Sequence, residues 1–124
     1  MINIEKQKIY DLEERTGLFG ENIIVFAKQI PKNVVTIPLI NQLVRSGTSV
    51  GSNYCEADCA ESRKDFEHKI GICKKEAKET KHWLRMVTQA TPELKEDAQR
   101  LWREAVELQL IFISIVKKSR LNKL

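Results

Sequence analysis

The stretch RSGTSVGSNY, residues 45–54, decides how the chain folds, because it reads either as a loop or as part of a helix. Its glycines, serines, threonine and asparagine are residue types that favour turns. Apolar and small residues nevertheless run through it at helical spacing, 4-4-3-4-3, at Leu39, Leu43, Gly47, Val50, Tyr54 and Ala57. This period predicts a helix that continues through the whole stretch.

The two glycines of the stretch have a packing role in this interpretation. A nucleotide-binding loop of the G-x-x-x-x-G-K-[ST] type is excluded, because Gly47 and Gly51 are only four residues apart and Ser52 follows. In a helix, small residues one turn apart let a second helix backbone approach closely. Each glycine lowers helix propensity by about 1 kcal/mol relative to alanine, so close packing must offset that loss.

The remainder of the chain also has helical periodicity. Pro31 stops the first helix, Ser62 with Asp65 resembles a capping box for the third, and Thr91 is predicted to cap the fourth. We predict an all-α, antiparallel up-down-up-down four-helix bundle with short connections. It forms a single domain, residues 1–124, with helices at about 12–30, 38–60, 63–89 and 93–120.

Composition narrows the class of protein. The chain has 124 residues, and its longest apolar stretch is far shorter than the roughly 20 residues of a membrane span. The first residues lack the apolar segment of a signal peptide, and three cysteines cannot all pair within one chain. We therefore expect a cytoplasmic protein with reduced thiols and no membrane partner.

The second and third helices are predicted to share a polar network. A turn near Glu61 and Ser62 pairs these helices in antiparallel order and places Glu76 and Glu79 within one turn of Arg45 or Ser49. The alternative, in which the glutamates are merely solvated, stays open because exposed charges are the norm. The predicted members of the network are Arg45, Ser49, Asn53, Glu76 and Glu79.

Residues 42–87 resemble the hallmark region of a four-helix-bundle family, the 23S rRNA intervening-sequence proteins. DLEERT at 11–16 and the helix end Ile30-Pro31-Lys32 are similar too. The matching elements are Arg45-Ser46, Ser49-Val50, Asn53, Glu56-Ala57, Ser62, Asp65-Phe66, Lys75-Glu76-Ala77, Glu79-Thr80 and Trp83-Leu84.

The resemblance implies a small bacterial protein, often encoded within large-subunit rRNA genes, that has no established enzymatic activity and forms a ring of five bundles. A similar fold occurs in the accessory variability determinant of diversity-generating retroelements. That protein is a basic pentamer that engages a reverse transcriptase and nucleic acid. No reverse-transcriptase partner comes with this sequence, so the resemblance does not assign a role in a retroelement to this chain.

Catalytic and metal-binding groups are sparse. His68 and His82 lie about 21 Å apart along one predicted helix, so no single site within one chain uses both. We predict no catalytic residue and no enzyme activity. Cys55 and Cys59 are one helical turn apart, and the turn between the second and third helices would bring His68 opposite them, so these three residues are the one candidate set of metal ligands. The fourth ligand that zinc prefers is not evident. We therefore predict free thiols, no metal and no cofactor.

A basic stripe on the third helix is the main candidate for function. Residues 1–62 carry 6 Lys/Arg against 8 Asp/Glu, whereas residues 63–124 carry 15 against 9. Cations at 4-3-4 spacing can track a phosphate backbone, although a solvated face is the alternative. The resemblance favours RNA or DNA as the partner. The predicted nucleic-acid-binding residues are Lys74, Lys78, Lys81 and Arg85.

The last helix is more apolar than one buried stripe requires. Eleven of the sixteen residues from Leu101 to Val116 are apolar, against about three in seven for a core-facing helix. Such a patch predicts a surface that contacts a partner, and we expect a homo-oligomer. The resemblance to the family implies that the oligomer has five subunits. The predicted interface residues are Trp102, Val106, Leu110 and Ile113. Two functions stay open: a nucleic-acid-binding assembly, and a structural or adaptor ring that binds a protein.

Overall fold

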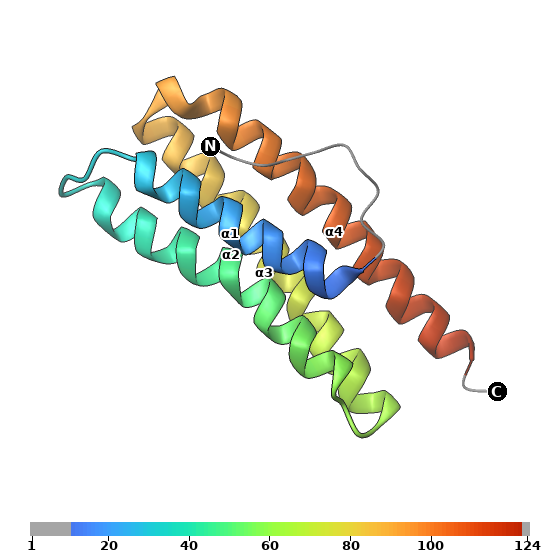
Figure 1. Ribbon diagram of the computed structural model, residues 1–124. Helices are drawn as coiled ribbons and strands as arrows, with labels where there is room; N and C mark the ends of the chain where they lie inside the picture. The colour runs from blue at the N-terminus through green and yellow to red at the C-terminus, as the bar shows by residue number, and fades with distance from the viewer. Residues whose placement is uncertain (1–10, 123–124) are drawn as a thin grey trace.

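The computed structural model describes residues 11–122, and within them the chain forms four α-helices and no β-strand. Residues 1–10 and 123–124 of the predicted domain lie outside the described part of the chain. Consecutive helices pack side by side in alternating directions, which confirms the all-α antiparallel four-helix bundle (Figure 1). The helices are α1 (Leu12–Gln29), α2 (Thr36–Asp58), α3 (Arg63–Ala90) and α4 (Lys95–Leu121), with a 3-10 turn at Pro92–Leu94 before α4.

Helix α1 is capped by Asp11 at its start and stopped by Pro31 at its end. The Asp11 side chain accepts the backbone N–H groups of Glu13 and Glu14, at 3.0 and 3.3 Å, and so satisfies two amides that the first turn leaves unpaired. At the other end Ile30 is extended, as a residue before a proline prefers, and Pro31 stops the helix.

Helix α2 begins at Thr36, two residues before the predicted start, because Asn33 organises the turn ahead of it. The Asn33 side chain accepts the backbone N–H groups of Val35 and Thr36, both at 2.9 Å. The Thr36 hydroxyl donates to the Pro31 carbonyl at 2.6 Å and accepts from the Asn33 N–H. Pro38 therefore lies in the first turn of the helix, where a missing N–H is tolerated.

The ends of α3 and α4 follow the predicted caps only in part. Ser62 caps α3, since its hydroxyl accepts the Asp65 N–H at 3.0 Å. Thr91 does not cap α4 with its side chain; its N–H donates to the Val87 carbonyl and closes α3 instead. A 3-10 turn then delays the start of α4 to Lys95, two residues later than predicted.

The glycines of residues 45–54 bring α1 and α2 into close contact, as predicted. A Cβ atom at Gly47 would lie 2.8 Å from two side-chain carbons of Ile23, and one at Gly51 would lie 3.3 Å from the Thr16 carbonyl oxygen. The core between the helices contains large apolar side chains from all four of them. The largest that are fully buried include Phe19, Phe26, Phe112, Ile23, Leu43, Ile70, Leu84, Leu101 and Leu108.

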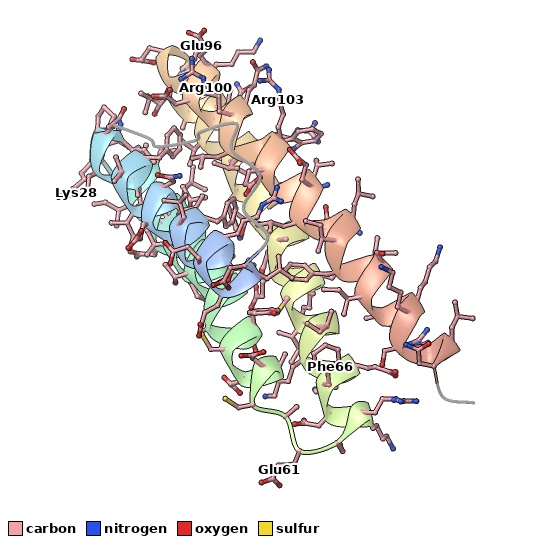
Figure 2. The ribbon with its side chains drawn as sticks, turned by 45° about the vertical axis from the view of Figure 1, so that its right-hand side comes forward. Lys28, Glu61, Phe66, Glu96, Arg100 and Arg103 are labelled. Atoms are coloured by element: carbon pink, nitrogen blue, oxygen red, sulfur yellow. The ribbon has the colours of Figure 1, made fainter. Side chains whose placement is uncertain are left out.

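The four helices differ in length, and this shapes the bundle. Helix α1 has 18 residues, whereas α3 and α4 have 28 and 27, so the second half of α4 continues past the start of α1 (Figure 1). Glu61 in the α2–α3 turn and Glu96 at the start of α4 mark opposite ends of the bundle (Figure 2). None of the described helices combines the length and apolarity needed to cross a bilayer.

Candidate nucleic-acid interface

The basic stripe of α3 consists of Lys74, Lys78, Lys81 and Arg85, and its cations have no acidic partner among residues 11–122. Three of the four side chains are exposed and Lys81 is half-buried. None of them forms an ion pair with an acidic residue in the described part of the chain, whereas Lys69 on the same helix pairs with Glu56 at 2.7 Å. The stripe therefore presents uncompensated positive charge to the solvent.

The basic stripe lies along the groove between α3 and α4. The Lys81 ammonium is 5.2 Å from the centroid of the Trp102 ring, which is within cation–π range. Towards the other end of the groove, the Ser119 hydroxyl donates to the Glu67 carboxylate at 2.6 Å. These two contacts show the antiparallel register of α3 and α4.

The apolar stripe of α4, namely Trp102, Val106, Leu110 and Ile113, forms the other side of the same groove. The register places Val106 next to Lys78 and Leu110 next to Lys74. In this single chain Trp102, Leu110 and Ile113 keep 44%, 60% and 37% of their surface exposed, and Val106 is half-buried. The sequence-predicted nucleic-acid site and the sequence-predicted oligomer interface thus adjoin each other on one face.

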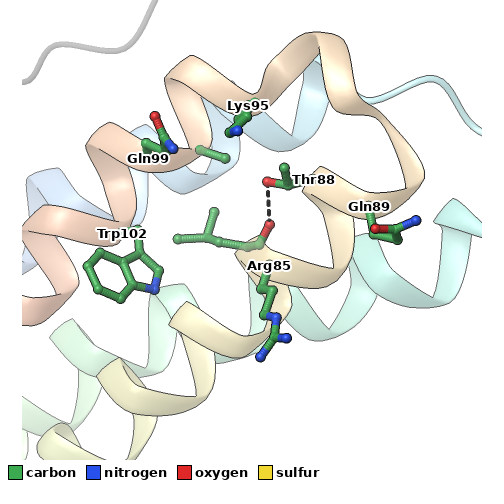
Figure 3. Close-up of a pocket in the computed structure, with 8 residues that line it drawn as sticks. Arg85, Thr88, Gln89, Lys95, Gln99 and Trp102 are labelled. Atoms are coloured by element: carbon green, nitrogen blue, oxygen red, sulfur yellow. Dashed lines mark hydrogen bonds between the residues drawn. The ribbon is translucent and has the colours of Figure 1, made fainter.

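A pocket of about 440 Å³ opens at the Trp102 end of this groove. Its walls are Leu84, Arg85, Thr88 and Gln89 from α3 with Lys95, Ala98, Gln99 and Trp102 from α4. Figure 3 shows the Trp102 ring at one side of the pocket and Arg85 and Gln89 at its rim, pointing outward. The Thr88 hydroxyl donates to the Leu84 carbonyl at 2.9 Å and so stays within its own helix.

The predicted polar network forms around Arg45, on the side of α3 that faces away from the basic stripe. The Arg45 guanidinium lies 2.7 Å from Glu79 and 3.3 Å from Glu76. The hydrogen bond from Arg45 lowers the pKa of Glu79, whereas burial raises the pKa of the more enclosed Glu76. Both carboxylates are therefore engaged by Arg45 and do not neutralise the stripe.

Two predicted members of the network bond elsewhere. The Ser49 hydroxyl donates to the Arg45 carbonyl at 2.6 Å, and the Asn53 amide donates to the Ser49 carbonyl at 2.8 Å. Short polar side chains in a helix reach the carbonyl of the preceding turn, and here that bond replaces one to the glutamates. The Arg45 side chain is 42% exposed, so the ion pairs lie at the surface and not in the core.

Several polar contacts were missed from the sequence, two of them between helices and well buried. Arg15 on α1 binds Glu104 on α4 in a bidentate pair, with both distances 2.8 Å, and reaches Glu107 at 3.3 Å. The Thr80 hydroxyl donates to the Ser46 hydroxyl at 3.0 Å, and both residues are fully buried between α2 and α3. The only sequence signal was the presence of two hydroxyl residues at core-facing positions of adjacent helices.

The cysteines and histidines do not assemble into a site. In residues 11–122, no three His, Cys, Asp or Glu side chains gather closely enough to hold a metal ion, so Cys55, Cys59 and His68 are not brought together. Burial raises the pKa of the Cys73 thiol to about 12, which keeps it protonated and unreactive. Burial, and then the charge of Glu13, also raise the pKa of Cys55.

Comparisons with known proteins agree with this architecture. The family model for the 23S rRNA-intervening sequence protein matches residues 9–114. A similar solved structure is a protein with unknown function from the S23 ribosomal protein family of Bacteroides thetaiotaomicron. It is 31% identical, the match covers 86% of this chain and 98% of that chain, and the TM-score is 0.76. No curated protein matches this sequence.

Proposed function

We propose that this chain, which belongs to the family of 23S rRNA-intervening sequence proteins, is a non-enzymatic protein that binds RNA in the groove between α3 and α4. The observation that carries the proposal is the basic stripe, whose four cations have no acidic partner among residues 11–122 and adjoin an exposed tryptophan. The free cysteines fit a reducing compartment, so the proposed site of action is the cytoplasm.

The chemistry of the groove favours a phosphate backbone. Four cations spread over 12 residues of α3 extend about 16 Å along the helix axis, enough to meet several consecutive phosphates. Each neutralised phosphate releases condensed counterions, so affinity falls as salt concentration rises. Among residues 11–122 no cation of the basic stripe is held in an ion pair that RNA binding would have to break.

A charge-matched comparison tests the site. One variant replaces all four residues of the basic stripe with glutamine. The other, a control set, removes the same charge from exposed lysine side chains that lie away from the groove and form no ion pair with a described residue. The control set is Lys28, Lys32, Lys64 and Lys118.

Affinity for a fluorescein-labelled single-stranded RNA is measured by anisotropy at several salt concentrations. The stripe variant should bind at least tenfold more weakly at low salt. Its slope of log K against log salt should flatten by up to about 3, since four phosphate contacts contribute about 0.7 each. The control set should bind nearly as the parent does. Equal losses in both variants would show a diffuse charge effect and reject the groove as the RNA site.

A second function is supported by the apolar stripe. Leu110 is 60% exposed on a helix that belongs to a compact bundle, which favours a neighbouring protein surface. We propose a homo-oligomer, a pentamer by resemblance to the family, which acts as a structural or adaptor ring if the RNA site fails its test. Leu110→Asp should lower the mass found by light scattering at micromolar concentration. A parent protein that is already monomeric would contradict assembly.

A further inference from the structure

We infer that the pocket beside Trp102 receives an unstacked base of single-stranded RNA. The inference rests on the proposed function, because it assigns a type of RNA to the same groove. It adds a specific site: the phosphates run along the basic stripe, and a base enters the pocket at the end of that stripe.

The pocket has the size and lining that a base requires. Its volume of about 440 Å³ falls within the range of small-ligand sites, and Leu84, Ala98 and the Trp102 ring supply apolar surface. Gln89 and Gln99 also line the pocket, with Gln89 at its rim and pointing outward (Figure 3), and a side-chain amide can both donate and accept hydrogen bonds. An open apolar pocket bordered by polar side chains suits a flat heteroaromatic ring with polar edges.

The position of Trp102 links the pocket to the phosphate track. The indole is 44% exposed, and the Lys81 ammonium lies 5.2 Å from its centroid. Arg85 belongs both to the basic stripe and to the pocket wall. A base stacked on the exposed part of the indole would therefore have its own phosphate close to Lys81 and Arg85.

This arrangement selects single strands over duplexes. In a duplex the bases are stacked and paired, so none can enter a pocket without being extruded, whereas a single strand offers free bases. Groove cations beside an aromatic platform are the combination by which proteins hold single-stranded nucleic acid. An acidic protein helix would also match the charge of the groove, but it has no flat group that requires the Trp102 pocket.

The experiment compares three probes on the parent and on Trp102 variants. The probes are a fluorescein-labelled ten-nucleotide oligouridylate, an abasic ten-mer with the same number of phosphates, and an RNA duplex of ten base pairs. The variants are Trp102→Ala, Trp102→Phe and, as a control at an exposed apolar position on α2, Ile37→Ala. Circular dichroism melts establish that each variant is folded.

The parent should bind oligouridylate about tenfold or more tighter than the abasic strand, because stacking of one base on an aromatic ring has that order of effect. Trp102→Ala should remove this difference and leave abasic binding unchanged. Trp102→Phe should retain most of it, and Ile37→Ala should retain all of it.

The failures of the two proposals are distinguishable. Equal binding of oligouridylate and abasic strand by the parent would overturn the base pocket and leave the phosphate track standing. A Trp102→Ala variant that loses both probes equally would also overturn the pocket, since the indole would then only position Lys81. A parent that binds none of the three probes would overturn both, and capture of an acidic helical peptide would then make the groove a protein site.

Discussion

The replacement of Gly47 by alanine tests whether close contact between α1 and α2 holds the bundle together. An added Cβ would lie 2.8 Å from both γ-carbons of Ile23 and 3.1 Å from its β-carbon. Ile23 has no exposed surface, so its side chain cannot move into solvent to make room. Overpacking of this kind destabilises by about 1–3 kcal/mol. Alanine in place of glycine within a helix stabilises by about 1 kcal/mol, so the net loss is about 1 kcal/mol.

The matched control is Gly17→Ala on α1, where no atom lies within 4 Å of the added Cβ. That variant should gain about 1 kcal/mol, because only the helix propensity changes. Urea unfolding followed by circular dichroism should therefore separate the two variants by about 1–3 kcal/mol, the overpacking contribution alone. In an Ile23→Ala background the separation should shrink, since the two γ-carbons are gone. Equal stability of the Gly47 and Gly17 variants in the parent background would refute the close-packing argument.

Two further predictions concern ion pairs. Arg15→Ala should lower the free energy of unfolding by about 1–2 kcal/mol, between the values for buried and surface pairs, because Glu104 keeps only 19% of its side chain exposed. Arg100→Ala is the control, since its contact with Asp97 is 3.9 Å long and exposed, and it should change stability by less than about 0.5 kcal/mol. Glu79→Gln should be less stable than the parent at neutral pH. Because the pKa of Glu79 is lowered in the folded protein, the difference in unfolding free energy between parent and variant should disappear as the pH falls through that pKa. A difference in unfolding free energy that persists at acid pH would contradict the ion-pair explanation.

The fold was predictable because each helix carries its own signals. The apolar period through residues 45–54 outweighed seven turn-forming residues, and Gly47 lies in contact with α1 in the fold. Ser62 capped α3 as predicted, since a cap depends only on residues within one turn. Thr91 does not cap α4, because the 3-10 turn at Pro92–Leu94 separates it from Lys95, the first residue of that helix.

The candidate site was predictable only in pieces. The pair between Arg15 and Glu104 joins residues 89 positions apart, and nothing in the local pattern of either helix selects that partner. Ser49 and Asn53 were assigned to the network because they share a helix face with Arg45. Each side chain instead donates to the backbone carbonyl of the residue four positions earlier in α2. Periodicity predicts the face on which a side chain lies, whereas the choice among hydrogen-bond partners depends on distances that only the folded chain defines.

The position of the two stripes shows most clearly what the fold adds. The basic stripe follows from the period of α3 and the apolar stripe from the period of α4, but the register that makes them neighbours appears only in the fold, where the Lys81 ammonium lies 5.2 Å from the Trp102 ring centroid. A protein neighbour that covered Leu110 would also cover Lys74, so the proposed assembly and the proposed RNA binding would compete at that end of the groove. Ile113 lies about 16 Å along α4 from Trp102. A subunit contact over the whole apolar stripe, Trp102 included, would cover the pocket as well, whereas a contact limited to Leu110 and Ile113 would leave it open to RNA.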